Sequence, residues 1–417
     1  MGLTRRTFVA STAAAVIGGR AAAAVDEKII LFGMPQDFTK IYTFLTVEYS
    51  QGQRDYFSLV NSRSGINGYK IVADVSDSAN DIPRAIETYE RLKREGMVLI
   101  DPLSTPVARA LVSRALEDKI NLVTPFSGRS DAADGTVFPY VMPLSPNYWS
   151  QAALIIEFFR QQDKDLKGKK LVLVHIDTPF GKEPIPILQT LSQKLGYEFA
   201  TFPYAPPGND QSAVWPQVRR AKPDWVIFWG AGVGQSSSLS EAIRNGIPVD
   251  RMCAQVWLSE SDMNVVGNDA AKGVLKVEPC ASGRDPKIIG DILKDVVGKR
   301  QGAGPDAKIG TSYYNYGVMM GAIMVEGVRL AFNRFPNGPI TGAWLNAGLT
   351  SITNFTAEGL LPAMTITKED HQGGGKGRIA RWDGTKFVPQ TDWFAAGQDV
   401  VWEEIYKSAE TFKTTGK

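Results

Sequence analysis

The sequence is poor in the side chains on which most metal centres and acid–base catalysts depend. Its 417 residues include two cysteines and two histidines. A disulfide scaffold and a Cys/His metal cluster are therefore excluded. Histidine chemistry would have to use His175, which ends an apolar segment, or His371, which lies in a polar one. We expect His175 to be buried or at a cleft edge, His371 to be solvated, and no cofactor or metal to be bound.

An excess of charge of one sign is also missing. The chain has 46 Lys and Arg against 44 Asp and Glu, which gives a net charge of +2. Nucleic-acid-binding proteins usually carry a basic excess or stripe, so we expect no nucleic-acid partner. Hydrophobic residues make up 43% of the chain and charged residues 22%, which rules out wholesale disorder and provides for a sizeable core.

Long hydrophobic runs are absent, because no stretch reaches the ~18 apolar residues that span a bilayer. At the N-terminus, Arg5 and Arg6 precede a shorter apolar run that ends near Ile17, and small residues through Ala24 follow. This order is typical of an export signal, and the paired arginines resemble the twin-arginine motif. We predict that residues 1–24 are a twin-arginine signal peptide, with an ordinary Sec signal as the alternative, and that the mature chain lies in the periplasm.

The periplasm is oxidising, which bears on the two cysteines. Cys253 and Cys280 could form a disulfide there, or they could remain two buried thiols. The sequence leaves both alternatives open.

Predicted strands and helices alternate along most of the chain. Lys28–Gly33 and Tyr69–Asp74 are predicted strands with a helix between them, and the same order continues to about residue 124. The pattern restarts after Leu144–Asn147, and Lys170–Ile176 has the continuous apolar character of a strand buried on both faces. This repetition predicts an α/β fold of two doubly wound units, split near residue 145. The chain beyond about residue 274 is expected to complete both units, which requires several crossings between them.

Catalytic motifs are missing from the chain. No G-x-S-x-G nucleophile elbow occurs, and Lys376 in the glycine run 373–377 is not followed by Ser or Thr, as a P-loop requires. Gly230–Gly234 follows a predicted strand, but its third glycine comes one residue early for a dinucleotide-binding loop. We therefore do not expect an enzyme.

The ends of the predicted strands in the first unit carry hydroxyl groups and free backbone amides. Ligands bind at the carboxyl ends of the strands in open α/β sheets. Ser104 and Thr105 follow one strand and begin a helix with Pro106 in its first turn, and Phe126–Gly128 follow the next strand. A helix N-terminus favours an anion, so the two loops together predict an anion pocket. For either loop alone, ordinary capping and turn formation is the alternative.

The strand ends of the second unit carry large aromatic side chains instead. Phe180, Trp229 and Trp257 all follow or close predicted strands. Their shared position favours an apolar cleft wall over burial in the core. A polar end in one unit and an aromatic end in the other suit a small amphipathic carboxylate.

A family resemblance rests on seven segments that occur in order. They are SGINGYKI (64–71), IPRAIETYERL (82–92), DPLST (101–105), INLVTPFSG (120–128), DTPFGK (177–182), PDWVIFWGAG (223–232) and NDAAKGV (268–274). Through them, residues 26–417 resemble the periplasmic solute-binding proteins of branched-chain amino acid-type ABC transporters, which have the class I binding-protein fold.

The resemblance implies two Rossmann-like lobes joined by a three-strand hinge, with a ligand cleft between them. Lobe 1 would comprise residues 26–145 plus 279–358, and lobe 2 would comprise residues 146–278 plus 359–417. It also implies a monomer that closes around a small-molecule ligand and is recognised by an ABC permease in the inner membrane.

The resemblance also implies where the ligand binds. Its carboxylate would be held by two loops of lobe 1, Phe180 would close the cleft, Tyr42 would contribute from the loop after the first strand, and the rest of lobe 2 would supply the wall. The expected site residues are Tyr42, Leu103, Ser104, Thr105, Phe126, Ser127, Gly128, Phe180, Trp229, Ala231 and Trp257. Ala231 stands where the family commonly has a tyrosine, which would enlarge the cleft.

One departure from the family bears on the ligand. Amino-acid binders of the family place an acidic residue near Gln255–Trp257 to pair with the ligand ammonium, and Ala254–Trp257 contains none. A buried ammonium without a counter-charge is costly. We therefore predict a carboxylate with an apolar or aromatic body and no α-ammonium, unless Glu260 or Asp262 reaches the cleft. A receptor for branched-chain or hydrophobic amino acids or amides, and a ligand-binding partner of a membrane sensor, are the alternatives.

Overall fold

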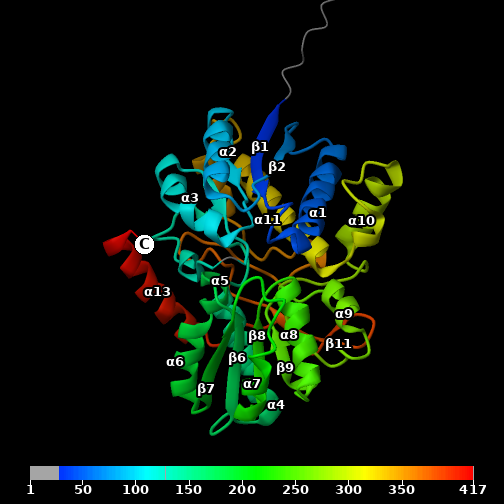
Figure 1. The fold of residues 1–417 in the computed structure, drawn as a ribbon. Helices are drawn as coiled ribbons and strands as arrows, with labels where there is room; N and C mark the ends of the chain where they lie inside the picture. Colours follow the sequence, from blue (N-terminus) through cyan, green and yellow to red (C-terminus); the bar gives the residue numbers. More distant parts are fainter. Residues whose placement is uncertain (1–27, 127, 417) are drawn as a thin grey trace, which may run out of the picture.

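The computed structural model describes residues 28–126 and 128–416. It has two lobes, each built on its own sheet and covered by helices (Figure 1). The predicted α/β fold of two doubly wound lobes is confirmed. The predicted signal peptide, residues 1–24, and Ser127 lie outside the described residues.

Lobe 1 contains a five-stranded parallel sheet in the order β2-β1-β3-β4-β5. Its strands are β1 (Ile29–Gln36), β2 (Lys70–Asp77), β3 (Leu99–Ile100), β4 (Asn121–Val123) and β5 (Val141–Met142). Its helices are α1 (Thr43–Ser62), α2 (Ile82–Arg94), α3 (Thr105–Asp118), α10 (Lys287–Asp295), α11 (Ser312–Arg334) and α12 (Gly342–Leu349). Alternate residues of β1 point to opposite faces. Phe32 packs in the core with α1 and α11, whereas Leu31 packs with α2 and α3.

Lobe 2 contains a seven-stranded mixed sheet in the order β12-β11-β10-β9-β8-β6-β7. Its strands are β6 (Lys170–Ile176), β7 (Glu198–Tyr204), β8 (Trp225–Trp229), β9 (Met252–Ala254), β10 (Leu275–Glu278), β11 (Arg378–Trp382) and β12 (Phe387–Pro389). Its helices are α4 (Tyr148–Asp163), α5 (Pro179–Lys182), α6 (Ile185–Leu195), α7 (Trp215–Ala221), α8 (Val233–Arg244), α9 (Glu260–Val266) and α13 (Gln398–Thr415). The antiparallel pair β11–β12, joined by a turn at Asp383–Gly384, forms one edge of this sheet.

Short 3₁₀ segments complete the two lobes. They are η1 (Ser130–Ala133), η2 (Val249–Arg251), η3 (Val297–Lys299), η4 (Asp306–Lys308) and η5 (Ala357–Gly359). The first of them, η1, follows the β4 loop and contacts the C-terminal helix α13.

The third crossing between the lobes comes later than the predicted boundary at 358/359. The backbone N–H of His371 donates to Ala133 O at 3.0 Å, and its ring Nδ1 lies 2.9 Å from Val141 O. Both partners belong to lobe 1. The chain therefore leaves lobe 1 only after His371, although the resemblance implied that residues 359–417 belong to lobe 2.

The expectation that His371 is solvated was wrong. Its side chain is 1% exposed and packs on Gly135, where a Cβ atom would lie 2.2 Å from its Nε2. Burial lowers the pKa of this imidazole. His175 is buried at the end of β6, which agrees with one of the two expected positions.

Helix α13 contacts both lobes. It begins beside α4 and α6 of lobe 2, and Figure 1 shows it along one side of the molecule. Near its end, Phe412 packs on Phe138 with ring centroids 4.6 Å apart and the rings tilted by 39°, and Ser408 donates to Asp131 at 3.1 Å. Both partners belong to lobe 1, so the last helix adds a contact between the lobes away from the cleft.

The two cysteines are free and buried in this structure. Cys253 lies on β9 and Cys280 follows β10, and burial raises the pKa of both thiols. Of the two alternatives left open by the sequence, the structure shows the buried thiols. Within residues 28–126 and 128–416, no helix is long and apolar enough to cross a bilayer.

Candidate ligand-binding site

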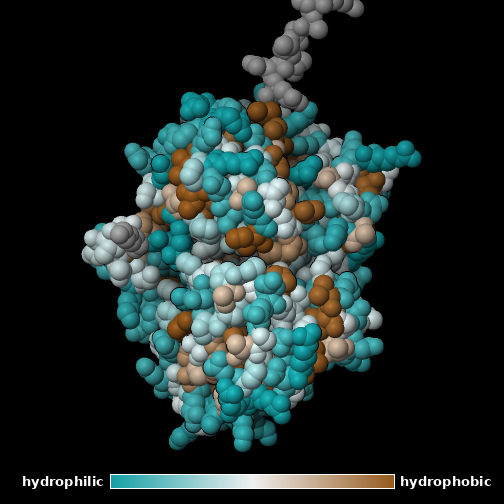
Figure 2. Space-filling view, viewed as in Figure 1, coloured by the Kyte–Doolittle hydropathy of each residue, from teal (hydrophilic) through white to brown (hydrophobic). Residues whose placement is uncertain are grey.

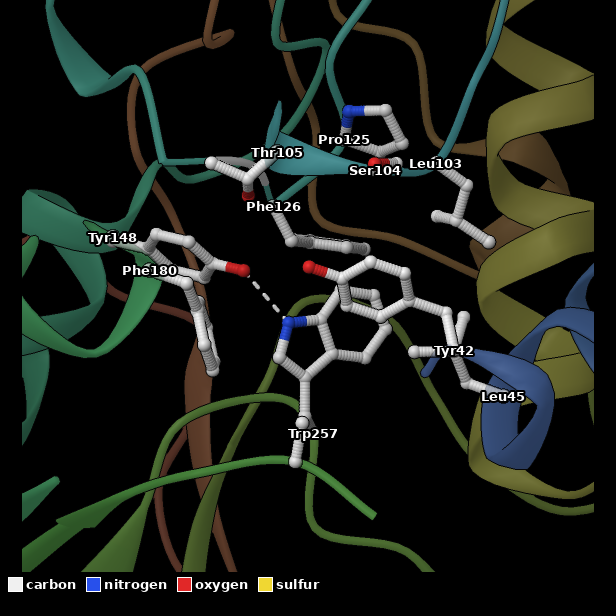
Figure 3. A pocket seen from close by; sticks show the side chains of 11 residues that line it. Tyr42, Leu45, Leu103, Ser104, Thr105, Pro125, Phe126, Tyr148, Phe180 and Trp257 are labelled. Atoms are coloured by element: carbon white, nitrogen blue, oxygen red, sulfur yellow. Dashed lines mark hydrogen bonds between the residues drawn. The ribbon is translucent and has the colours of Figure 1, made fainter. Parts of the chain in front are cut away.

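A small cavity, here called the inner cavity, lies where the strand-end loops of the two lobes meet. Loops after β1, β3 and β4 line it from lobe 1, and loops after β6, β8 and β9 line it from lobe 2 (Figure 3). Its lining residues are Tyr42, Leu45, Leu103, Ser104, Thr105, Pro125, Phe126, Tyr148, Phe180, Ala231 and Trp257. Eight of the eleven residues predicted for the site are among them.

The inner cavity is nearly filled by aromatic side chains from both lobes. Its volume is ≈ 20 Å³, about the room that one water molecule needs. Phe126 of lobe 1 lies edge-on against Trp257 of lobe 2, with ring centroids 5.3 Å apart. The indole N–H of Trp257 donates to the Tyr148 hydroxyl at 2.7 Å, and Tyr148 packs on Phe180. The two lobes are therefore in contact across the cleft in this structure.

Thr105 is the hydroxyl best placed to bind a ligand. Ser104 caps α3, accepting from Val107 N at 3.3 Å and donating to Asn80 Oδ1 at 2.7 Å, so its hydroxyl is already used. The Thr105 hydroxyl accepts from Gly128 N at 3.1 Å, and its own proton has no acceptor among the described residues. Thr105 is also the first residue of α3, where the helix dipole is positive.

Two residues of these loops have strained backbones. Leu103 has φ 46° and Phe126 has φ 49°, which is the left-handed region. This conformation costs roughly 1–2 kcal/mol for a residue with a Cβ atom and concentrates at binding sites and active sites. The strain occurs in the two lobe 1 loops that were expected to hold a carboxylate.

Two of the predicted site residues that the structure describes, Gly128 and Trp229, do not line the inner cavity. Gly128 is engaged within lobe 1, because its N–H donates to Thr105 and its carbonyl accepts from Arg109 Nε at 2.7 Å. Trp229 lies in the core behind Tyr148, with ring centroids 5.4 Å apart. The expectation that it forms the cleft wall was wrong, since Tyr148 stands between it and the cavity. Ser127 lies outside the described residues.

The residue that supplies this part of the wall, Tyr148, was missed in the sequence. It begins α4, directly after the first crossing between the lobes, and Asn147 caps that helix by accepting from Ser150 N at 2.8 Å. The sequence rule for ligand sites concerns strand ends, whereas Tyr148 follows a hinge segment. An aromatic residue directly after the predicted crossing at 145 was the available signal.

Tyr42 and Tyr148 point into the cavity from opposite sides, as Figure 3 shows for their hydroxyl groups. Burial, together with the nearby Asp37 carboxylate, raises the pKa of Tyr42 to about 12. Burial also raises the pKa of Tyr148. Both hydroxyls are therefore protonated at neutral pH and able to donate hydrogen bonds.

Neither acidic residue that could have paired with a ligand ammonium reaches the inner cavity. Glu260 accepts from the backbone N–H and the hydroxyl of Ser312, at 3.1 and 2.9 Å. Asp262 accepts from Ser259 N at 2.9 Å and caps α9. All eleven lining side chains of the inner cavity are uncharged.

A buried carboxylate joins the lobes beside the cavity. Glu183 of lobe 2 accepts from Ser130 N of lobe 1 at 2.8 Å, and lies 3.3 Å from Arg109 Nη2, also of lobe 1. Burial raises the pKa of Glu183. Because Arg109 also holds the carbonyl of Gly128, the ion pair connects lobe 2 to the loop after β4.

Comparisons with known proteins agree with this architecture. Residues 30–386 match the family model described as periplasmic binding protein. A solved structure from the Pseudomonas fluorescens group, described as an ABC transporter permease, is 32% identical with a TM-score of 0.86, and the alignment covers 93% of this chain and 97% of that one. A search of the curated proteins finds no match.

Two more distant structures share the fold. A branched-chain amino acid ABC transporter protein from Thermus thermophilus, with bound valine, is 20% identical with a TM-score of 0.78, covering 91% of this chain and 99% of that one. A solute-binding protein from R. palustris, in complex with benzoate, is 18% identical with a TM-score of 0.71, covering 88% of this chain and 97% of that one.

The two-lobed fold, with a cavity between the lobes, is that of a solute-binding receptor. The chain belongs to the periplasmic binding protein family, and specifically to the solute-binding proteins of branched-chain amino acid-type ABC transporters. The predicted family is therefore confirmed. It is a family of non-enzymatic receptors, and membership implies the periplasm as location and a transporter permease as partner.

Proposed function

We propose that the protein is the receptor of an ABC importer and captures a monocarboxylate that has an apolar or aromatic body and no α-ammonium. The observation that carries the proposal is the absence of any charged side chain from the described lining of the inner cavity, with Glu260 and Asp262 engaged elsewhere. An ammonium buried there would have no counter-charge, which costs several kcal/mol.

The inner cavity does offer hydrogen-bond donors to a carboxylate. The Thr105 hydroxyl, the positive end of α3 and the hydroxyls of Tyr42 and Tyr148 all face the inner cavity. Donors of this kind bind a carboxylate without a cation of the protein. Phe180 and Trp257 supply the apolar surface on the lobe 2 side. The benzoate held by the R. palustris structure is a ligand of this chemical class on the same fold.

The proposal also covers export of the protein, closure of its lobes and recognition by the permease. Residues 1–24 act as a twin-arginine signal peptide, and the mature monomer closes its two lobes over the ligand. Lobe 1 then comprises residues 26–145 plus 279–371, and lobe 2 comprises residues 146–278 plus 372–417. The closed form is then recognised by the permease in the inner membrane.

Thermal unfolding of residues 25–417 with a panel of ligands tests the proposal. The panel holds aromatic acids, branched aliphatic acids, hydrophobic amino acids and small amides. A ligand at 100 times its Kd adds about 2.7 kcal/mol to the free energy of unfolding. We expect stabilisation by the acids alone. Stabilisation by leucine or phenylalanine alone would show that an acidic residue reaches the ligand, and would favour an amino-acid receptor.

A further inference from the structure

A second and much larger cavity, here called the vestibule, opens outward from the inner cavity between the lobes. Its volume is ≈ 740 Å³, against ≈ 20 Å³ for the inner cavity. Tyr42, Thr105, Phe180 and Ala231 line both, so the two spaces adjoin each other at these four residues. A volume of this size lies within the range of small-molecule sites.

The vestibule is mainly apolar and takes side chains from both lobes. Ile41 and Phe44 come from lobe 1, and Ile176, Pro207 and Val233 come from lobe 2. Ile41 is 60% exposed and Val233 is 49% exposed, which is unusual for aliphatic side chains. Figure 2 shows hydrophobic side chains at the boundary between the lobes on this face, among others scattered over both lobes. An apolar group bound here would bury this surface and gain the hydrophobic free energy of doing so.

Charged side chains in the vestibule are of one sign. Arg109 and Lys40 line it, and none of its described lining residues is acidic. Arg109 lies one helical turn after Thr105 on α3, so its guanidinium and the Thr105 hydroxyl belong to the same helix face. The hydrogen-bond donors available to a monocarboxylate are therefore the Thr105 hydroxyl and the Arg109 guanidinium. Thr105 lies where the two cavities adjoin, here called the Thr105 junction, and Arg109 lines the vestibule.

We infer that the ligand is an elongated monocarboxylate whose carboxylate lies at the Thr105 junction and whose apolar tail fills the vestibule. The inference rests on the proposed function and narrows its ligand class. The inner cavity has room for about one water in this structure, so it takes no more than the carboxylate unless the aromatic cluster moves. A tail that extends outward needs no such movement.

The test is a homologous series of straight-chain monocarboxylates from butanoate to dodecanoate, with Kd measured by calorimetry on residues 25–417. Each methylene buried in the vestibule should tighten binding about threefold to fourfold. We expect this gain along the series until the vestibule is full, and a plateau beyond. Affinity that stays constant from butanoate onward would overturn the inference and leave the proposed function intact.

Primary amides of the same chain lengths distinguish the inference that the tail fills the vestibule from the proposal that the ligand is a carboxylate. Amides that bind as tightly as the acids, with the same dependence on length, would support the vestibule and contradict the proposed carboxylate selectivity. No binding in either series would overturn both claims.

A pair of valine variants locates the tail. Val233→Asn replaces an apolar side chain of the vestibule by a polar one of similar size, and we expect it to weaken decanoate binding about fivefold while leaving butanoate unchanged. Val265→Asn is the control, because Val265 is 73% exposed on α9 and does not line the vestibule. Equal effects of both variants, or no effect of Val233→Asn, would contradict this placement of the tail.

Discussion

Phe126 of lobe 1 meets Trp257 of lobe 2 edge-to-face, with ring centroids 5.3 Å apart and planes at 87°. Such a contact contributes about 0.5–1.5 kcal/mol beyond the area it buries. Both rings line the inner cavity, so the contact joins the two lobes there. A ligand that enters the inner cavity must therefore replace an existing contact, whereas a ligand that uses the vestibule can keep it.

The hydrogen bond from Trp257 to Tyr148 should contribute to stability. Tyr148→Phe removes the acceptor and leaves a buried indole N–H unpaired, so the free energy of unfolding should fall by about 1–3 kcal/mol. Urea unfolding measures this loss. In Trp257→Phe the donor is already gone, so adding Tyr148→Phe should then cost clearly less. An equal cost in both backgrounds would show that the bond contributes nothing.

The ion pair between Glu183 and Arg109 should favour the closed form. Glu183→Gln keeps an oxygen that can accept from Ser130 N but removes the charge, and we expect ligand affinity to fall by up to about fivefold, the range of a partly exposed pair. Calorimetric titration measures the change. Asp177→Asn is the control, because it breaks the pair with Lys182 within lobe 2 alone. A matching loss in the control would mean that contact between the lobes is not involved.

Gly232 lies where the lobes touch, and alanine there should impair closure. Its φ is 53° with ψ −130°, and a Cβ atom would lie 2.7 Å from Phe44 Cδ1 of the other lobe. Gly246→Ala is the matched control, since Gly246 also has positive φ but a Cβ atom there would meet nothing within 4 Å. Gly246→Ala should lose about 1 kcal/mol of stability from the backbone, and Gly232→Ala more, because its ψ lies outside the left-handed helical region and its Cβ atom meets Phe44. We expect only Gly232→Ala to weaken ligand binding, by tenfold or more, and equal binding by both variants would contradict the contact.

Asp262 should make the protein less stable at neutral than at acid pH. Burial raises the pKa of this carboxyl to about 7, above its value in the unfolded chain. Its contribution to stability is therefore fully present below about pH 4 and is lost as the pH rises toward 7, by about 1.4 kcal/mol per unit of pKa shift.

Asp262→Asn removes this titration and keeps an oxygen that can accept from Ser259. Denaturant unfolding of both proteins between pH 4 and pH 8 gives the comparison. The difference in unfolding free energy, variant minus wild type, should grow with pH across this range. A constant difference would show that Asp262 does not titrate there.

The sequence predicted the parts of the site that follow local rules. Ser104 and Thr105 were found because hydroxyls before a helix at a strand end bind anions, and that rule needs no knowledge of distant contacts. Tyr148 was missed because its place depends on where the first crossing delivers α4. Trp229 was assigned to the wall wrongly, since only the structure shows Tyr148 in front of it.

The errors in the predicted fold have the same cause, because local sequence rules do not predict contacts between distant segments. Lys368–His371 is polar in sequence and His371 was expected to be solvated, yet His371 is held against β5 and η1 by hydrogen bonds to Val141 and Ala133. These partners lie more than 200 residues away in the chain. Periodicity and turn residues describe a segment and its neighbours, so they carry no information about such pairings.

The central claim is that the ligand is a carboxylate without an α-ammonium, and a matched pair tests it most directly. Phenylalanine differs from 3-phenylpropanoate only by its ammonium group. Calorimetric titration of residues 25–417 with each compound should give measurable binding of 3-phenylpropanoate and at least tenfold weaker binding of phenylalanine, because the ammonium finds no acidic partner. Tighter binding of phenylalanine would contradict the account.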